Sequence, residues 1–159
     1  FLMGSKPISV YAVGGSLNEI EYEDHATMMI KFENGNNAIV EVNWITPMKA
    51  RTVSLTCEKS LVELDYMKQE ITASSSVFID PKNPNQFPAN LEIKRDLVPV
   101  ENAEPLRLEI EDFVECIRSS GNGESFSPLV DGEQGIMALR VALAALESIK
   151  SGEVVSIGN

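Results

Sequence analysis

Four consecutive runs of alternating apolar and polar residues constrain the fold of this chain more than any other feature. They occupy residues 26–33, 38–45, 52–57 and 61–67. In a strand, successive side chains point to opposite faces, so a period of two indicates a strand with one buried face. Four such runs in succession predict an antiparallel meander that the rest of the chain must cover or extend.

The connections between these runs carry turn residues. Residues 34–37 read Asn-Gly-Asn-Asn, which tolerate positive φ and predict a hairpin loop. Lys59 and Ser60 join the last two runs as tightly. Further alternating runs predict additional strands at residues 8–13, 70–74 and 91–98. Residues 74–90 are rich in Ser, Pro and Asn, and this composition predicts a long loop.

Helical spacing of apolar residues begins in the last third of the chain. One helix is predicted to start at Pro105, a residue favoured at the first helical position, and to end within residues 119–123. A second helix, residues 132–150, is preceded by a capping box formed by Asp131 and Gln134. Both helices carry an apolar stripe, so both are expected to pack against the sheet.

These elements, with a short last strand at residues 154–155, predict an α+β fold. We expect a single, mostly antiparallel open sheet of about six strands, with two helices packed on one face. The other face is then free for oligomerisation, because a half-apolar sheet face of this size is rarely left in water. With 159 residues, the chain is predicted to form one domain spanning residues 1–159.

The composition excludes several classes of partner. The sequence has 13 Lys and Arg against 24 Asp and Glu, which gives a formal net charge of −11. No basic patch is visible, so neither nucleic acid nor an acidic membrane is an expected partner. Cys57 and Cys116 are predicted to be buried free thiols, as in a reducing compartment. No apolar stretch is long enough to span a membrane and no signal peptide is seen, so the predicted location is cytoplasmic.

The sequence offers no convincing catalytic constellation. Gly14 and Gly15 follow a strand, but an acidic connection comes next, where a phosphate-binding loop would open a helix. His25 is the only histidine and is interpreted as a surface or capping residue; with no second ligand at suitable spacing, no metal site is predicted. The neighbouring Glu23 and Asp24 are interpreted as part of a solvated face. We therefore predict no catalytic, cofactor-binding or metal-binding residue in this chain.

The best candidates for contact with a substrate are Trp44, Lys49 and Arg51, at the end of the second run and in the turn after it. Two interpretations of each stay open. Trp44 either packs in the core or contacts a ligand. Lys49 and Arg51 either are solvated surface cations or reach an anionic or polyol ligand.

The order of several short motifs carries a further signal. They are FLMG at residues 1–4, ISVYA at 8–12, EDHA at 23–26, FENG at 32–35, VNW at 42–44, EPL at 104–106, GEQG at 132–135 and SGEVV at 151–155. Together, in this order and spacing, they resemble the C-terminal domain of the Gfo/Idh/MocA family, the glucose–fructose oxidoreductase and inositol dehydrogenase group.

The resemblance implies a parent protein with an N-terminal Rossmann domain that binds NAD or NADP and is absent from this chain. Residues 1–4 look like the end of a helix whose body lies upstream, so the catalytic lysine and histidine of the family would precede Phe1. The implied parent is an NAD(P)-dependent dehydrogenase that acts on a hydroxyl of a sugar, polyol or nucleotide sugar.

For this chain itself, the resemblance implies one wall of the substrate pocket and the open sheet face through which a homo-oligomer, dimer or tetramer, forms. No cofactor is expected to bind to this chain alone. Two alternatives stay open: a stand-alone ligand-binding or assembly module without catalysis, and an NAD-dependent glycosidase of the same family.

Overall fold

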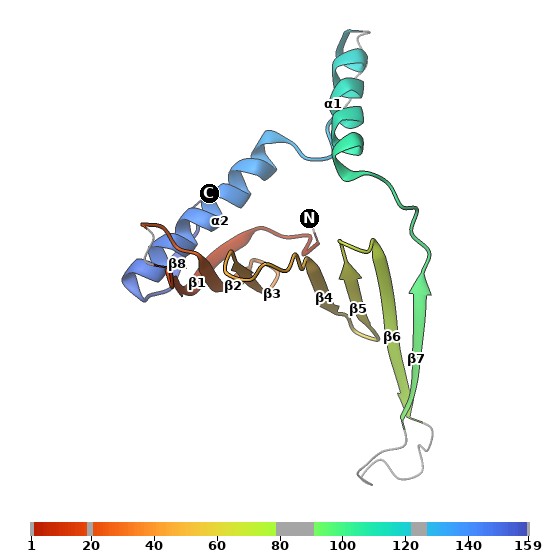
Figure 1. Cartoon of the computed structure of the whole chain (residues 1–159), viewed down its shortest axis with the longest axis horizontal. Helices are drawn as coiled ribbons and strands as arrows, with labels where there is room; N and C mark the ends of the chain where they lie inside the picture. The colour runs from red at the N-terminus through yellow and green to blue at the C-terminus, as the bar shows by residue number, and fades with distance from the viewer. Residues whose placement is uncertain (1, 19–20, 79–90, 122–126, 159) are drawn as a thin grey trace. The chain divides into compact units, whose positions relative to one another are not determined.

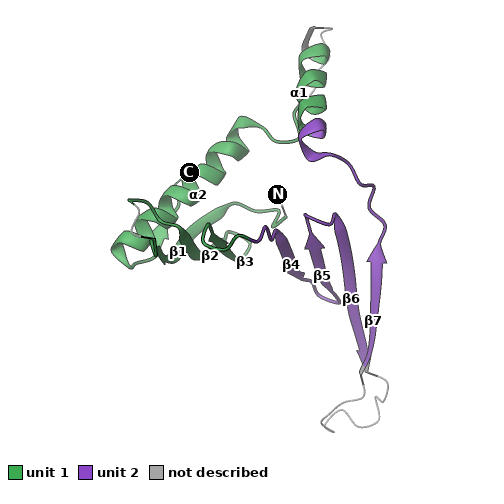
Figure 2. Cartoon of the chain, in the orientation of Figure 1, with its two compact units in different colours: residues 1–47, 109–159 green, residues 48–108 purple. Residues whose placement is uncertain are grey.

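The computed structural model describes residues 2–18, 21–78, 91–121 and 127–158 (Figure 1). The chain divides into two compact units, Phe1–Pro47 with Glu109–Asn159, and Met48–Leu108 (Figure 2). The described elements are β1 (Pro7–Gly15), β2 (His25–Phe32), β3 (Asn37–Asn43), β4 (Thr52–Thr56), β5 (Leu61–Asp65), β6 (Glu70–Phe78), β7 (Leu91–Val98), α1 (Pro105–Gly121), α2 (Gly132–Ser151) and β8 (Val155–Ser156). The α+β class predicted from the sequence is confirmed.

The first unit is built on a four-stranded antiparallel sheet in the order β3-β2-β1-β8. We call it the first sheet. Its β2–β3 hairpin turns at Gly35, whose φ of 85° suits glycine, so the predicted Asn-Gly loop is confirmed. Gly14 allows a close approach of β1 to β2, because a Cβ there would lie 2.5 Å from the carbonyl oxygen of His25.

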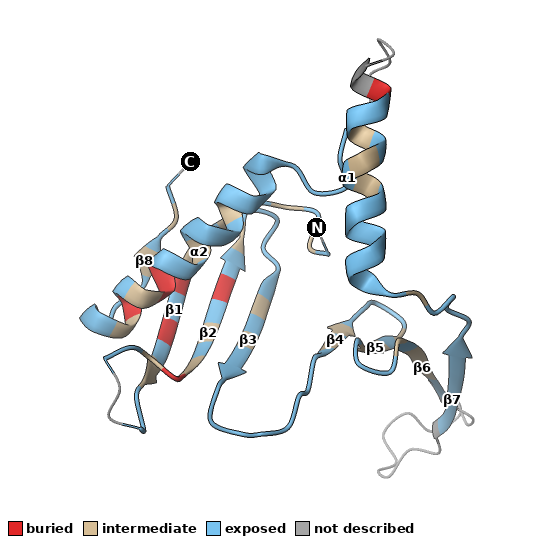
Figure 3. Cartoon of the chain, turned by 45° about the horizontal axis from the view of Figure 1, so that its top comes forward, coloured by how far each residue is buried: buried red, intermediate tan, exposed pale blue. Residues whose placement is uncertain are grey.

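The core of this unit lies between the first sheet and α2, which packs on β1 and β8. Its buried residues are Val10, Ala12, Ile30, Ala144 and Ala145, and buried segments of β1, β2 and α2 are red in Figure 3. The buried strand residues all belong to the face that the alternation predicts to be apolar.

One buried serine joins helix and sheet in this core. The hydroxyl of Ser148, fully buried on α2, accepts a hydrogen bond from the backbone N–H of Ala12 at 2.9 Å and donates one to the carbonyl of Glu153 at 2.6 Å. The helix ends directly afterwards at Gly152, in the left-handed region with φ 72°. At its other end the predicted capping box of Asp131 and Gln134 is present.

The second unit contains another four-stranded antiparallel sheet, in the order β4-β5-β6-β7. We call it the second sheet. The tip of its β5–β6 hairpin includes Gln69, which has φ 55°. The side-chain amide of Gln69 donates to the carbonyl of Ala103 at 2.7 Å and accepts from its N–H at 2.9 Å, so the segment after β7 is held against this tip.

The expectation of one sheet of about six strands is wrong, because the strands form two sheets and the break falls between β3 and β4. The side-chain oxygen of Asn43 accepts hydrogen bonds from the backbone N–H and the hydroxyl of Thr46, at 3.1 and 2.9 Å. This local turn, followed by Pro47 with no N–H to donate, leads the chain out of the ladder.

Two further expectations are corrected. Residues 74–78, predicted to open a long loop, continue β6, and the rest of that prediction, residues 79–90, lies outside the described residues. Within its own unit α1 does not share the packing of α2 on the first sheet, and its apolar side chains Ile110, Phe113 and Ile117 are exposed.

Candidate functional site

Trp44 stands at one end of the first sheet. Strand β3 ends at Asn43, and the indole of Trp44 is 91% exposed, so the interpretation of Trp44 as a core residue is wrong. Its backbone N–H donates to the carbonyl of Asp24 at 2.8 Å, which fixes the start of the following turn. An exposed indole on a fixed backbone is available to stack on a ligand.

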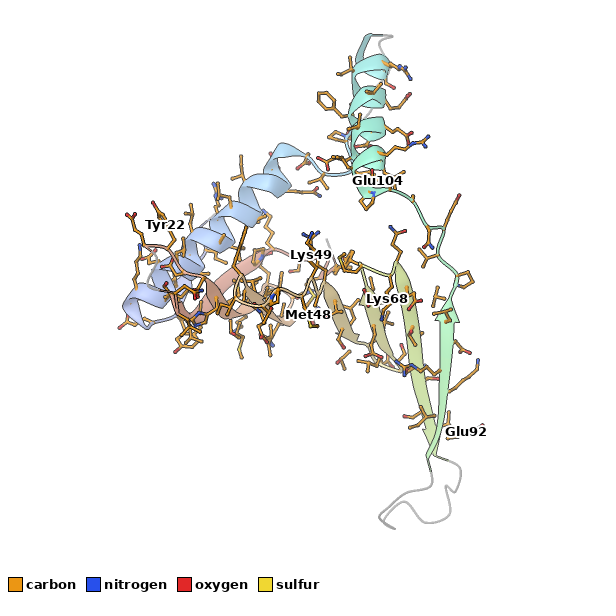
Figure 4. All side chains as sticks on the ribbon, viewed as in Figure 1. Tyr22, Met48, Lys49, Lys68, Glu92 and Glu104 are labelled. Atoms are coloured by element: carbon orange, nitrogen blue, oxygen red, sulfur yellow. The ribbon has the colours of Figure 1, made fainter. Side chains whose placement is uncertain are left out.

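Lys49 and Arg51 belong to the second unit, in the segment that leads into β4. Both are exposed, and neither forms an ion pair with another described residue (Lys49 is labelled in Figure 4). The carbonyl of Arg51 accepts from the N–H of Tyr66 at 2.9 Å, which extends the pairing of β4 with β5 by one bond. The Arg51 backbone is therefore fixed, while its guanidinium forms no ion pair among the described residues. Trp44, in contrast, belongs to the first unit.

Asp24 is a buried charged residue, so its interpretation as part of a solvated face is wrong. It is 3% exposed, and its carboxylate accepts from the backbone N–H groups of Leu17 and Asn18 and from the Asn18 amide, at 3.0 to 3.2 Å. The ring nitrogen Nδ1 of His25 lies 2.9 Å from the same carboxylate. Hydrogen bonds from His25, and also from Leu17 and Asn18, hold the pKa of Asp24 below its usual value.

His25 is consequently an oriented imidazole rather than an isolated surface residue. An ionised carboxylate only accepts hydrogen bonds, so Nδ1 of His25 carries a proton and Nε2 of the neutral ring is an acceptor. The side chain is 37% exposed and its Cε1 lies beside Gly15. The signal for this pair was the adjacency of Asp24 and His25 at the start of a strand, which by itself does not indicate burial.

The two cysteines differ from expectation in burial but not in oxidation state. Cys57 follows the last residue of β4 and is exposed, so the prediction of a buried thiol is wrong there. Cys116 on α1 is half-buried. Burial raises its pKa, as does the nearby charge of Asp112. Neither cysteine forms a disulfide bond with a described residue.

The described residues do not fit a nicotinamide dinucleotide or a metal ion. The loop after Gly14 and Gly15 leads to β2 rather than to a helix. The backbone N–H groups of this loop, which a pyrophosphate would need, donate to the Asp24 carboxylate instead. Within the described ranges no three His, Cys, Asp or Glu side chains group as metal ligands. Nor is any helix in the described part of the chain long and apolar enough to cross a membrane.

The comparison with known families agrees with the fold. Residues 1–63 match the family model described as the GFO/IDH/MocA C-terminal domain. This match confirms the family resemblance predicted from the sequence. Among proteins with curated functions, none matches.

Solved structures extend the likeness over almost the whole chain. One is UDP-N-acetylglucosamine 3-dehydrogenase GnnA from Acidithiobacillus ferrooxidans, with 20% identity and a TM-score of 0.69, where 92% of this chain aligns with 43% of that one. Aldose-aldose oxidoreductase from Caulobacter crescentus, complexed with glycerol, gives 21% identity and a TM-score of 0.69, with coverage of 98% and 42%. For the WlbA dehydrogenase from Bordetella pertussis, in complex with NADH and UDP-GlcNAcA, the sequence identity is 21% and the TM-score is 0.64. Here 97% of this chain aligns with 40% of that one.

At these identities the solved structures show a shared fold. The chain spans about two fifths of the length of each of these structures. The likeness in fold to these structures therefore extends beyond residues 1–63, which the family model matches.

Proposed function

We propose that this chain is the C-terminal substrate-binding and oligomerisation domain of an NAD(P)-dependent oxidoreductase that acts on a hydroxyl of a sugar, polyol or nucleotide sugar. The observation that carries the proposal is the match of residues 1–63 to the Gfo/Idh/MocA C-terminal domain. The structural relatives support it, since their names include a nucleotide-sugar dehydrogenase and an aldose oxidoreductase.

Hydride transfer in the parent protein would use a nicotinamide cofactor held by a Rossmann domain outside this chain. The contribution of this chain is then to bind and orient the substrate, which lowers the entropic cost of reaching the reactive geometry. Trp44 offers a stacking surface, and the exposed side chains of Lys49 and Arg51 offer donors to hydroxyl or phosphate oxygens.

Oligomerisation is proposed to use the open face of the first sheet, the face opposite α2. Its centre is apolar and exposed at Tyr11, Met29 and Ile39, which share one row across three strands. The row on one side carries Lys31 and the row on the other side carries Glu41. A two-fold axis near Met29 that sets the two copies antiparallel would place Lys31 of one copy opposite Glu41 of the other.

The test is to express the complete reading frame that contains this chain and to follow NAD(P) reduction with a sugar, a polyol and a nucleotide sugar. Arg51→Ala is expected to raise KM about tenfold with little change in kcat, because it removes a substrate contact away from the reacting atoms. Lys59→Ala, an exposed lysine in the β4–β5 turn, is the matched control. A complete protein that lacks a nucleotide-binding domain, or that oxidises none of the three substrates, would refute the proposal.

A further inference from the structure

An asparagine followed by a glycine stands at the tip of the β2–β3 hairpin. Asn34 and Gly35 are both exposed, and a Cβ built on Gly35 would have no atom within 4 Å, so the peptide bond between them is open to water. Every other asparagine among the described residues precedes a residue that carries a Cβ. The sequence has one more Asn-Gly pair, at residues 122–123, which lies outside the described residues.

This pair can react with itself. The backbone nitrogen of Gly35, after losing its proton to a base, attacks Cγ of the Asn34 carboxamide. A bond forms between that nitrogen and Cγ, the bond from Cγ to Nδ2 breaks, and Nδ2 leaves as ammonia. Water then opens the succinimide ring at either of its carbonyls, which gives aspartate or isoaspartate. Glycine favours the attack because it has no Cβ to obstruct the approach of its nitrogen to Cγ.

The backbone of the hairpin assists this attack at one atom. The N–H of Asn36 donates to Oδ1 of Asn34 at 3.1 Å. Negative charge develops on this oxygen when the Gly35 nitrogen adds to Cγ, and an N–H held at hydrogen-bond distance stabilises that charge. The same bond folds the Asn34 side chain back over the turn, so the carboxamide is kept near the attacking nitrogen.

The attacking nitrogen is engaged while the turn is closed. The N–H of Gly35 donates to the carbonyl of Phe32 at 3.0 Å, and this bond must break before the nitrogen can turn toward Cγ. Bonds at an exposed hairpin tip open at little cost in free energy, so the reaction proceeds from the briefly opened turn. The ladder between β2 and β3, which begins at the pair Lys31 and Asn37, does not need to open.

Asn34 also connects the hairpin to the start of the chain. Its Nδ2 donates to the carbonyl of Met3 at 3.0 Å, and its backbone N–H donates to the Ser5 hydroxyl at 3.2 Å. The N–H of the neighbouring Glu33 donates to the carbonyl of Lys6 at 3.0 Å. The N-terminal segment is therefore bonded to this loop at three points, and the donor that reaches Met3 is the group that leaves as ammonia.

We propose that Asn34 is a site of spontaneous deamidation, and that the modification detaches the N-terminal segment from the β2–β3 hairpin. The product aspartate has only acceptor oxygens, so it faces the Met3 carbonyl without a proton to donate. Isoaspartate also adds a methylene group to the backbone before Gly35, which displaces the bond from Gly35 to Phe32. The inference goes beyond the proposed function, because the loop reacts whatever the parent protein catalyses.

The experiment is incubation of the 159-residue protein at mildly alkaline pH, followed by trypsin digestion and mass spectrometry, with an unincubated sample to correct for conversion during digestion. Tryptic peptide 32–49 contains Asn34 together with the internal controls Asn36, Asn37 and Asn43. We expect Asn34 to convert at least about tenfold faster than any of these, with isoaspartate among the products. Asn34→Gln, which keeps a carboxamide but would need a larger ring, is expected to remove this conversion.

Amide hydrogen exchange measures the detachment. The backbone N–H groups of Glu33 and residue 34 are expected to exchange at least about fivefold faster in the deamidated protein and in Asn34→Asp than in fresh protein. The matched control is Asn36→Asp, which adds the same charge to the same loop at a side chain that forms none of the bonds to the N-terminal segment. Its exchange at these two positions is expected to equal that of fresh protein.

Equal conversion of Asn34 and the three internal controls would refute the modification site, as would a conversion of Asn34 that occurs only in urea. Deamidated protein whose exchange at Glu33 matches that of fresh protein would overturn the detachment. An equal acceleration of exchange in Asn36→Asp would show that added charge in the loop, rather than loss of the bond to Met3, is the cause, and it would also overturn the detachment.

Discussion

Asp24 holds the junction between β1, β2 and β3 through both its carboxylate and its backbone. The carboxylate binds the β1–β2 loop and His25, while the carbonyl accepts from Trp44. A buried carboxylate is tolerated only when its hydrogen-bonding capacity is filled, and here the loop of residues 17 and 18 fills it. The position of the exposed Trp44 thus depends on Asp24, which lies four residues before Met28, a side chain packed against the core.

Asp24→Asn is expected to reduce the loss of folding stability that occurs as the pH falls into the acid range. Because the pKa of Asp24 is lower in the folded than in the unfolded state, its stabilisation is complete above the unfolded value of about 3.9. It is lost as the pH falls through the folded pKa. Thermal melts of both proteins between about pH 2 and pH 6 measure this, with Glu21→Gln in the same loop as control. An equal loss of stability in both proteins would contradict the assignment.

Gly14 and Gly15 give a matched pair of substitutions. Gly14→Ala is expected to destabilise the protein by about 1 to 3 kcal/mol, because its Cβ would meet the His25 carbonyl oxygen at 2.5 Å and the backbone of β1 and β2 must shift. Gly15→Ala is expected to be tolerated, since its Cβ would be 3.9 Å from the His25 ring. Urea denaturation measures the difference, and equal midpoints for the two variants would show that the close approach is not required.

At the scale of elements, α2 is joined to the first sheet by apolar contact and by one hydroxyl. Val10 and Ala12 contact the small residues Ala144 and Ala145, which allow the helix to lie close to β1. At that short separation the Ala12 N–H is covered, and Ser148 replaces the water it would otherwise bind.

Ser148→Ala is therefore expected to cost about 1 to 3 kcal/mol, since it leaves the Ala12 N–H buried without an acceptor. Ser151→Ala, at the exposed end of the same helix, is expected to cost less than about 1 kcal/mol. Chemical denaturation gives both values. A Ser148→Ala variant as stable as Ser151→Ala would mean that the Ala12 N–H finds another partner.

Most elements of this fold were predictable because their signals are local. Alternation located β1 to β5 and β7, and the capping box located α2 to within one residue. The split into two sheets was not predictable, since it depends on the Asn43 side chain turning back on Thr46.

The candidate substrate residues show the same limit. Trp44 fell on the apolar side of its run by alternation, yet β3 ends one residue earlier and the indole is exposed. The sequence predicts a solvated acid at Asp24, because burial of a carboxylate requires donors that the sequence does not pair with it. In both cases the deciding contact joins segments separated along the chain.

At the scale of the whole molecule, self-association is expected through the open face of the first sheet. Ile39→Glu introduces a charge at the β3 end of the apolar row, and should raise the dissociation constant of the oligomer at least about tenfold. Sedimentation velocity at micromolar protein measures it. The control is Leu129→Glu, an exposed apolar position between the two helices. A wild-type protein that is monomeric throughout, or an unaffected Ile39→Glu oligomer, would exclude this interface.

The second unit is one continuous segment, Met48–Leu108, inserted between the two parts of the first. During synthesis from the N-terminus, β1 to β3 therefore leave the ribosome about a hundred residues before the α2 residues that cover Val10 and Ala12. The inserted unit can complete its own sheet in that interval, whereas the first sheet waits with its apolar face uncovered and β1 without β8. The unit formed by both ends of the chain is thus the last to become complete, and its exposed nascent strands are the point at which a chaperone would be needed.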